Sequence, residues 1–577
     1  MADVVDLVDR TGSTDAAAAG EPRRGSVSRR FRRLGGALIL VLVLAAGTLL
    51  TVLSEQQVGS SPRRDFEIAG RIPATVFLPG SVPDGLPAIA FAEPEPVGRR
   101  PPVVVLVHGH TADRETMSPL ARSLAVAGYA VVTFDLPGHG ASRVPFSATP
   151  FGSELDKFRA DLKAVLDWLG RYPYVDGERI LLMGHSLGAA MVVDFAARDP
   201  RPLATVAFSG SVNPYLDGEF RPRNLLFLVA ADEAVEIHSE TRATFGQLAG
   251  APPVDGRTLG DPVLGTGLRH NSVEGVDHLT ILYSDHAFEE ALSWADTTTG
   301  RTGQTVTGLR DPRLATAGWY ALCAAFLLAG LGIWAGRTAP RLPTVPARGV
   351  HWRLLALTGA LVAAIAVVSV GGLDGRTLAG FLSLEGGDAV FSFLAITGGI
   401  LLAVRALAAG RGTGVRPGWL GEAAGDTRPF VPGLRRLLVP ALIAVAGAYI
   451  LIAPLGPVFH RLVPTPQRLL LVPLAALVVF PFFFALESLL RRGSVLTATL
   501  ASIAGRLIVV VVLTIGLFRW AFQDIVWLYV PFVAALFAVF EVIATGIYAA
   551  CRDHRLTAVV QSALLGWIVA VLVPWNG

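Results

Sequence analysis

Cysteine, lysine and charge are all scarce in this chain. Its 577 residues include two cysteines, and residues 54–300 contain neither of them, so disulfides contribute nothing to that stretch. Only 16% of the residues are charged and 52% are hydrophobic, with a mean hydropathy of +0.52. A soluble domain is typically about 25% charged and about 45–50% apolar. The composition therefore excludes a wholly soluble protein.

The net charge of +3 hides an uneven distribution of sign. Residues 54–300 carry 20 basic and 31 acidic side chains, whereas residues 301–577 carry 22 basic and 10 acidic ones. Residues 1–53 are also slightly basic. An acidic middle thus lies between basic flanks, and we assign the positive charge to loops that border a membrane. We therefore expect no nucleic-acid partner.

One apolar run lies near the N-terminus, at residues 34–53, and it contains no charge. Twenty apolar residues are enough to cross a hydrocarbon core of about 30 Å. A cleavable signal peptide is the alternative, but the run is long and no clear A-x-A site follows it. We expect an uncleaved transmembrane anchor, preceded by a disordered, basic cytoplasmic tail over residues 1–33.

After a linker at residues 301–313, the pattern becomes that of a polytopic membrane domain, over residues 314–577. Eight further spans are predicted, which makes about nine in all, although the short gap near Gln523 could hide a re-entrant pair. They lie at residues 314–336, 354–372, 389–410, 437–456, 469–490, 501–520, 525–549 and 556–575.

Arginine placement orients these predicted spans. With a cytoplasmic N-terminus, the arginine-rich loops all lie on the cytoplasmic side, including Arg491 with Arg492 and Arg552 with Arg555. The opposite loops carry more carboxylates. The acidic middle is then extracytoplasmic, and the protein is expected in the cell membrane as a multi-pass chain.

Three ionisable residues stand out inside the predicted spans: Glu487, Arg506 and Glu541. A charge at membrane depth is costly and often functional. Here a structural explanation suffices, because Glu487 lies four residues before Arg491 and Arg506 can pair with Glu541 across helices. A transport or proton-relay role is the alternative.

The acidic middle alternates strand and helix patterns. The run PVVVLV at residues 102–107, followed by His108, is typical of a buried parallel strand. Helix patterns at residues 117–127 and 154–169 separate it from strand patterns at residues 129–134 and 179–183. Such alternation indicates a mostly parallel sheet with helices on both faces.

The third of these strands runs into Gly184-His-Ser186-Leu-Gly188, a G-x-S-x-G motif between a strand and a helix. A tight strand-to-helix turn lifts the Ser186 hydroxyl above the sheet, and the two glycines leave room for the crowded turn. The helix N-terminus behind the serine offers unpaired N–H groups to a developing oxyanion. We predict that Ser186 is a catalytic nucleophile.

With these motifs, residues 70–297 resemble the α/β-hydrolase family. The resemblance depends on VVVLVHGH at 103–110, FDLPGHGAS at 134–142 and LLMGHSLGAA at 181–190. The family orders its triad as nucleophile, acid and histidine, which implies an α/β-hydrolase domain over residues 54–300.

The resemblance also implies the remaining site residues. The family places its acid just after a strand such as residues 224–230, which favours Asp232, with Glu233 and Glu236 as competitors. His278, in the loop after the last strand, is the expected general base. The oxyanion hole is expected to use the N–H groups of Leu187 and His110. We expect no cofactor, as in this family generally, and no metal, because no ligand-type spacing occurs.

Only about fourteen residues separate the strand ending near Ser209 from the one starting at Asn224. Many family members insert a helical cap there, so this chain is expected to lack one. We hypothesise that the membrane surface or an outer loop, such as residues 457–468, covers the site instead.

The function that these observations favour is a membrane-bound serine hydrolase that cleaves carboxylic esters through an acyl-enzyme. Its substrate would be an ester or acyl-bearing small molecule or lipid, and peptidase activity is not excluded. The first alternative is an acyltransferase acting on a lipid or cell-envelope acceptor. The second is a transporter or sensor with an accessory hydrolase-like domain. The sequence leaves the oligomeric state open.

Overall fold

The structure is a computed structural model. It describes residues 63–79, 100–146, 152–210, 220–301, 306–309, 311, 350–370, 378–385, 387–410, 460–520 and 526–576. The predicted anchor at residues 34–53 and the predicted spans at 314–336 and 437–456 lie outside these residues.

The N-terminal part contains one sheet of nine strands in the order β1-β2-β4-β3-β5-β6-β7-β9-β8. The six neighbours from β4 to β9 pair in parallel, and β1, β2 and β8 are antiparallel at the edges. The strands are β1 (Arg63–Ile68), β2 (Ile72–Phe77), β3 (Pro102–Val107), β4 (Ala130–Phe134), β5 (Asp176–His185), β6 (Ala204–Phe208), β7 (Leu225–Ala230), β8 (Thr258–Leu259) and β9 (Leu268–Val273).

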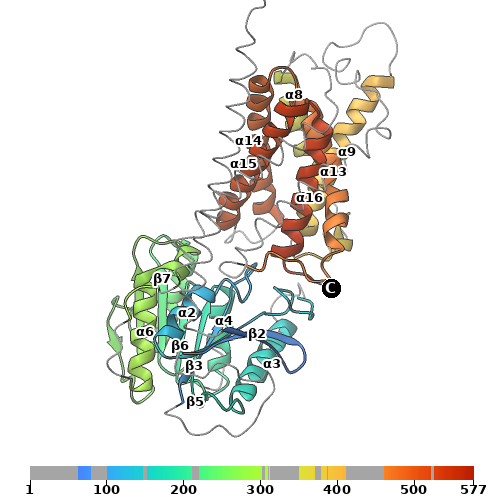
Figure 1. The fold of residues 1–577 in the computed structure, drawn as a ribbon. Helices are drawn as coiled ribbons and strands as arrows, with labels where there is room; N and C mark the ends of the chain where they lie inside the picture. The colour runs from blue at the N-terminus through green and yellow to red at the C-terminus, as the bar shows by residue number, and fades with distance from the viewer. Residues whose placement is uncertain are drawn as a thin grey trace, which may run out of the picture.

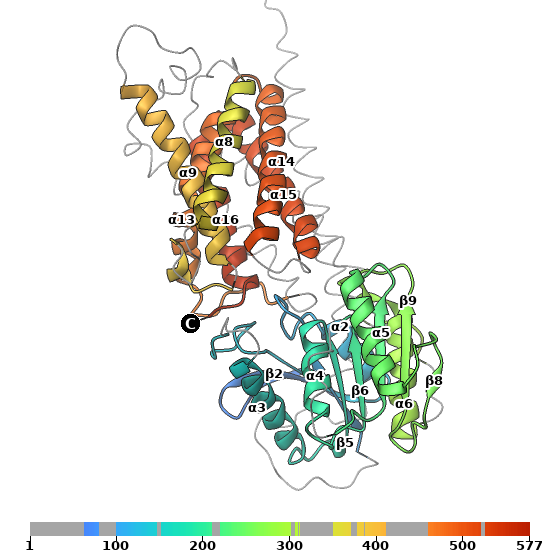
Figure 2. The same ribbon diagram turned by 180° about the vertical axis from the view of Figure 1, so that it is seen from behind.

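Helices cover both faces of this sheet, as Figures 1 and 2 show from opposite sides. Helices α2 (Ser118–Val126) and α6 (Asp285–Thr299) pack on one face, and α3 (Gly152–Leu169), α4 (Leu187–Ala196) and α5 (Val235–Ala249) pack on the other. The strand interiors are fully buried because successive side chains of β3 enter opposite cores. The expected mostly parallel α/β sheet is therefore present.

The C-terminal part is a helical bundle, shown above the sheet in Figure 1. Among the residues that the structure describes, six helices are long and apolar enough to cross a membrane. They are α8 (Val350–Val370), α9 (Gly387–Gly410), α13 (Leu471–Leu490), α14 (Val495–Trp520), α15 (Val526–Cys551) and α16 (His554–Leu572). Each corresponds to one of the eight predicted spans.

Four buried charged side chains hold this bundle together. Arg491 bonds Glu487 at 2.8 Å and Glu541 at 2.6 Å. Arg506 bonds the same two carboxylates at 2.6 and 2.7 Å. Gln561 joins α16 to the cluster by bonding Glu487 and Arg506. The expected structural pairing of Glu487 with Arg491 and of Arg506 with Glu541 is thus present.

Candidate active site

Ser186 occupies the turn between β5 and α4. Its backbone has φ 53° and ψ −117°, a strained conformation for a residue with a side chain. The turn is held by the Ser186 N–H, which donates to Phe208 O, and by the Ser186 carbonyl, which accepts from Ala189 N. The serine is half-buried. This is the geometry expected of a nucleophile elbow.

Two glycines make the elbow possible. A Cβ on Gly184 would lie 2.1 Å from the carbonyl oxygen of Gly188, and one on Gly188 would lie 2.2 Å from the carbonyl oxygen of Val107. Neither oxygen can move without breaking backbone structure. Any larger residue at either position must therefore displace the elbow or the end of β3.

His278 lies in the loop after β9 and contacts a carboxylate. Its Nδ1 is 2.8 Å from Oε2 of Glu233, and the two side chains are 5% and 1% exposed. Because a carboxylate accepts, Nδ1 carries the proton and Nε2 is left as the basic nitrogen. The second oxygen of Glu233 accepts from Ala234 N at 2.9 Å, which fixes the carboxylate in place.

The carboxylate that meets His278 is therefore Glu233, whereas the sequence favoured its neighbour Asp232. The Asp232 backbone N–H bonds Val276 O at 3.1 Å, and the residue is exposed. Consecutive side chains in a turn point in different directions, so only one of the two can face the histidine. Glu236, the other competitor, is exposed in the first turn of α5.

Neighbouring side chains hold the His278 loop against the elbow. His185, adjacent to Ser186, places Nε2 2.7 Å from the carbonyl oxygen of His278, and the two rings lie 4.9 Å apart. Asp277 accepts from the N–H groups of Leu279 and Thr280. Burial opposes ionisation of Asp277, but hydrogen bonds from the Thr280 hydroxyl and from these N–H groups lower its pKa. The sequence predicted a structural or pocket-lining role for His185, whereas nothing in its pattern marked Asp277 as a support of this loop.

The two predicted oxyanion donors belong to segments next to Ser186, the start of α4 and the loop after β3. Leu187 is the first residue of α4, where a helix leaves its N–H groups without intrahelical partners. His110 follows Gly109, and a Cβ on Gly109 would lie 3.1 Å from the Ser186 Cβ. The loop after β3 therefore passes directly beside the serine.

A group of imidazoles lines that loop. The rings of His108 and His110 lie 5.2 and 5.6 Å from the ring of His139. Burial lowers the pKa of His110 to about 4 and that of His139 well below its ordinary value. His108 Nε2 accepts from Leu136 N at 3.1 Å, which ties the loop after β3 to the one after β4. These histidines are neutral supports at neutral pH.

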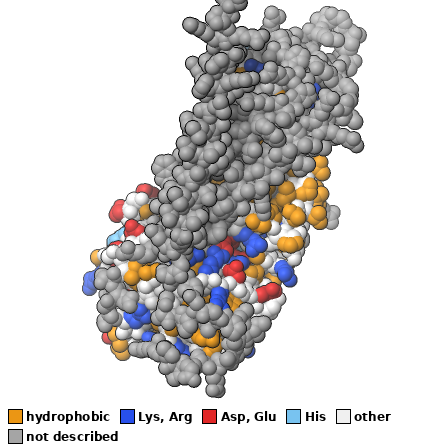
Figure 3. All heavy atoms as spheres, viewed as in Figure 1, with side chains coloured by type: hydrophobic (Ala, Val, Ile, Leu, Met, Phe, Trp, Pro, Cys, Tyr) orange, Lys and Arg blue, Asp and Glu red, His pale blue; other side chains and the backbone are white. Residues whose placement is uncertain are grey.

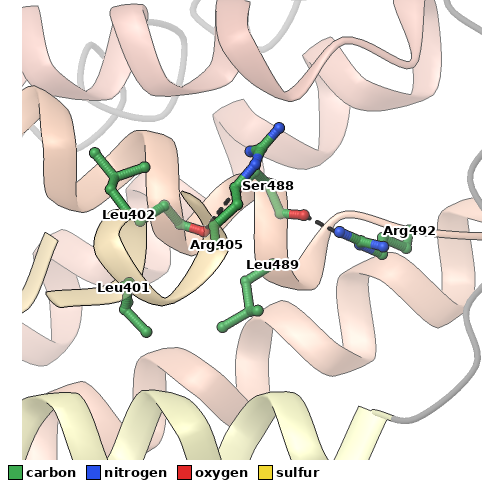
Figure 4. A pocket seen from close by; sticks show the side chains of 7 residues that line it. Leu401, Leu402, Arg405, Ser488, Leu489 and Arg492 are labelled. Carbon is green, nitrogen blue, oxygen red and sulfur yellow. Dashed lines mark hydrogen bonds between the residues drawn. The ribbon is translucent and has the colours of Figure 1, made fainter. Parts of the chain in front are cut away.

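In the described ranges, no three histidine, cysteine or carboxylate side chains gather as metal ligands. The absence of a metal and of a cofactor stays a prediction. A recess between α9 and α13, shown in Figure 4, is lined by residues of the bundle alone. These are Leu401, Leu402, Arg405, Ala485, Ser488, Leu489 and Arg492. The recess therefore contains none of the residues around Ser186.

Part of this chain is similar to known proteins. Residues 99–231 match the family model described as serine aminopeptidase, S33. The chain is 30% identical over 205 residues to the uncharacterized protein Rv2307c of Mycobacterium tuberculosis (strain ATCC 25618 / H37Rv), an alignment that covers 33% of this chain and 68% of that relative. The chain belongs to the α/β-hydrolase family.

Two further relatives have names that state an activity. A thermostable monoacylglycerol lipase of Bacillus sp. (strain H-257) is 29% identical over 127 residues, covering 22% of this chain and 48% of the lipase. The polyketide transferase ATR5 of Stachybotrys chlorohalonatus (strain IBT 40285) is 29% identical over 168 residues, covering 29% of this chain and 51% of the transferase. The chain thus spans about half the length of these two relatives.

Proposed function

We propose that this protein is a membrane-bound serine hydrolase that cleaves carboxylic esters through a Ser186–His278–Glu233 triad. The observation that carries the proposal is the buried contact between His278 Nδ1 and Glu233 Oε2. A carboxylate buried against one ring nitrogen fixes the tautomer that leaves the other nitrogen basic. The strained elbow at Ser186 supports the same role.

The reaction proceeds in two half-reactions. The Ser186 Oγ attacks the ester carbonyl carbon, and His278 Nε2 takes the hydroxyl proton. The N–H groups of Leu187 and His110 stabilise the oxyanion. The C–O bond to the alcohol then breaks, and His278 returns the proton to the departing alkoxide. Water attacks the acyl-enzyme with His278 again as base, and the products are a carboxylic acid and free Ser186.

The membrane part of the proposal follows from the apolar helices. Six described helices have the length and composition of spans. Together with the predicted spans at residues 34–53, 314–336 and 437–456, they make a multi-pass chain of about nine spans. The arginine-rich loops support a cytoplasmic N-terminus and an extracytoplasmic hydrolase domain.

Acyl transfer is the second candidate, and one relative named as a transferase favours it. The acyl-enzyme is common to both reactions, and only the second nucleophile differs. Product analysis separates them: hydrolysis releases the free acid alone, whereas a transferase yields an acylated acceptor.

A matched pair of adjacent substitutions tests the triad. We expect Glu233→Gln to lower the turnover of a 4-nitrophenyl ester by about 10³–10⁴-fold, because the histidine loses its correct tautomer and its counter-charge. Asp232→Asn, one residue away and exposed, should leave turnover within roughly twofold. The reverse ranking would return the acid role to Asp232, and equal small effects would contradict a triad at this site.

A further inference from the structure

Among the residues that the structure describes, two segments of the bundle half bond the α/β domain. They are residues 460–468, which precede α13, and residues 573–576, which follow α16. We call them the docking loop and the C-terminal strap. The Trp567 indole N–H of α16 bonds Leu462 O at 3.0 Å, so the docking loop is itself fixed to the bundle.

The docking loop bonds a buried carboxylate of the α/β domain. Asp113, whose side chain is 0% exposed, accepts from Arg461 N at 2.7 Å and lies 3.3 Å from His460 Nδ1. The other oxygen of Asp113 accepts from Glu115 N at 3.0 Å within its own turn. One buried carboxylate therefore shapes the loop after β3 and holds it to the bundle.

Arg468 links the docking loop to both the strap and the α/β domain. Its guanidinium donates to the carbonyl oxygen of Gly138 and, at 3.4 Å, to that of Val573. Burial lowers the pKa of Arg468 to about 10, although Asp135 and Asp113 oppose this. The group therefore stays cationic at neutral pH, so a full charge is buried at this contact.

The strap pairs with the loop after β4. Trp575 N donates to Gly138 O at 3.0 Å, and Phe146 N donates to Trp575 O at 2.8 Å. The Phe146 ring lies 5.8 Å from His110 and 5.6 Å from His139. Phe146 thus contacts both the strap, through its N–H, and His110, the expected oxyanion donor, through its ring.

All of these contacts lie at the catalytic edge of the sheet. Asp113 follows the carboxyl end of β3, and Gly138 and Phe146 follow that of β4. In α/β sheets, ligands bind outside the carboxyl ends of the strands. The edge that carries the reacting groups is therefore the edge that faces the bundle.

Exposed apolar side chains lie beside the same contacts. Leu469 and Leu470, directly after Arg468, are 59% and 70% exposed. Phe381 is 61% exposed in a segment that the strap also bonds, through Asn576 N to Ser383 O at 2.7 Å. Figure 3 shows hydrophobic side chains at this end of the bundle, next to charged ones at the contact with the α/β domain.

The place of these exposed leucines beside α13 indicates where they lie relative to the membrane. Leu470 immediately precedes a twenty-residue helix with the length and composition of a span; with α13 in the membrane, the exposed Leu470 side chain lies at the end of the hydrocarbon layer. The polar contacts of Arg468 begin two residues earlier. The catalytic edge is thus held at the membrane surface.

We propose that the docking loop and the C-terminal strap form the membrane-side wall of the Ser186 site and that the substrate is a membrane-resident lipid ester. This inference depends on the proposed esterase function. The acyl chains of such a lipid stay among the spans while its ester group reaches Ser186 at the headgroup level. Arg468 is a positioning residue, because it aligns the loop after β4 with the bundle and touches no reacting atom.

The experiment uses the full-length chain in phospholipid nanodiscs with two ester probes. One is water-soluble 4-nitrophenyl acetate, and the other is a diacylglycerol with a fluorescent acyl chain, held in the same bilayer. Arg468→Ala is compared with Arg461→Ala in the same loop. The Arg461 side chain bonds Val463 O in its own loop, and its contact with Asp113 uses the backbone.

We expect the wild-type chain to hydrolyse both probes, with both activities lost in Ser186→Ala. Arg468→Ala should lower turnover of the bilayer probe by about tenfold, the effect of losing one buried charged hydrogen bond, and leave the soluble probe within about twofold. Arg461→Ala should change neither probe.

Three other outcomes overturn the inference in distinguishable ways. Serine-dependent hydrolysis of the soluble probe without any hydrolysis of the bilayer probe would refute the lipid substrate and leave the esterase intact. An equal loss on both probes in Arg468→Ala would make Arg468 merely structural. No hydrolysis of either probe would refute the esterase function itself.

Discussion

The Ser186 backbone has a strained conformation, and this conformation positions the serine hydroxyl. A non-glycine residue at positive φ costs of order 1–3 kcal/mol and persists only where its surroundings enforce it. Here the enforcing contacts are the bonds of the elbow to Phe208 and Ala189 and the close approach of Gly184 to Gly188. These backbone contacts fix the elbow and thereby hold the hydroxyl at the edge of the sheet.

Substituting a glycine of the elbow tests this. We expect Gly184→Ala to destabilise the α/β domain by about 1–3 kcal/mol or more and to abolish esterase activity, since the new methyl group meets a backbone oxygen. Gly246→Ala in α5 is the control, because its Cβ would meet nothing closer than 3.9 Å. Thermal unfolding and ester turnover of both variants give the answer. An active, stable Gly184→Ala protein would contradict the crowding argument.

Buried imidazoles predict how stability depends on pH. Burial lowers the pKa of His110 from 6.5 to about 4 and that of His185 from 6.5 to about 3. Between about pH 6.5 and 4 the unfolded chain therefore binds protons that the folded chain does not, so stability falls as the pH falls through this window. Asp135, whose pKa is lowered chiefly by Arg114 against the effect of burial, loses its contribution only at lower pH.

The measurement is thermal unfolding of the full-length chain at about pH 7.5 and about pH 5. We expect a lower midpoint at the acidic pH, and a smaller decrease in His110→Asn, which has one fewer group to protonate on unfolding. A midpoint that rises on acidification would refute the buried neutral histidines.

Single residues also show where sequence reasoning stops. The strand-turn-helix pattern around G-x-S-x-G predicts the elbow, because the crowded turn requires the two glycines of the motif. The acid was favoured at Asp232, yet Glu233 contacts His278. The sequence places a carboxylate after β7 but does not give the direction of each side chain in a turn. In the structure the Asp232 N–H bonds Val276 O, a contact between distant segments that the local pattern does not reveal.

At the scale of elements, the bundle is fixed by a neutral cluster of two arginines and two glutamates. Its members come from α13, the turn after it, α14 and α15, and Gln561 adds α16. Each carboxylate accepts from both guanidinium groups, so no single charge is left alone in a region of low dielectric constant. Such a cluster specifies which helix faces meet, which apolar packing alone specifies poorly.

Removing one member should therefore cost much more than removing an apolar neighbour. We expect Glu541→Gln to lower the free energy of unfolding by about 3–5 kcal/mol, because two buried arginines lose a shared counter-charge. Val542→Ala, at the next residue and 59% exposed, should have little effect. Thermal unfolding in detergent compares the two. Similar midpoints for both variants would show that the cluster is dispensable.

Long apolar helices are predictable from sequence because a run of about twenty apolar residues matches the thickness of a bilayer and is uncommon elsewhere. Six predicted spans correspond to described helices, with ends that differ by a few residues; α14, for example, begins at Val495 and not at residue 501. The difference arises because Val495–Leu500 has a less apolar composition but continues the helical hydrogen bonding. The pairing of Arg506 with Glu541 was foreseeable from their chemistry, whereas the second bond of each was not.

In the whole molecule, the bundle forms direct hydrogen bonds with the α/β domain. The docking loop and the strap reach its catalytic edge through Asp113, Gly138 and Phe146. The sequence suggested that an outer loop near residues 457–468 could cover the site, and residues 460–468 do contact this edge. The strap was not foreseen, since residues 573–575 are apolar and fall inside the predicted span at 556–575, whereas α16 ends at Leu572.

Hydrogen exchange can detect this contact in the intact protein. The Phe146 amide donates to Trp575 O, and the Trp575 amide donates to Gly138 O. Trp575→Pro removes the second donor, so we expect faster exchange in the peptide containing Phe146. Exchange in β6, far from the strap in the sheet order, should not change. Unchanged exchange at Phe146 would mean that the strap does not hold this loop in solution.

The most direct test of the central claim is labelling of the full-length chain in membranes with a fluorophosphonate, which reacts only with activated serines. We expect labelling of wild type and of the surface variant Ser239→Ala, none of Ser186→Ala, and strongly reduced labelling of Glu233→Gln. Labelling that survives in Ser186→Ala, or its absence in the wild-type protein, would contradict an activated serine at the elbow.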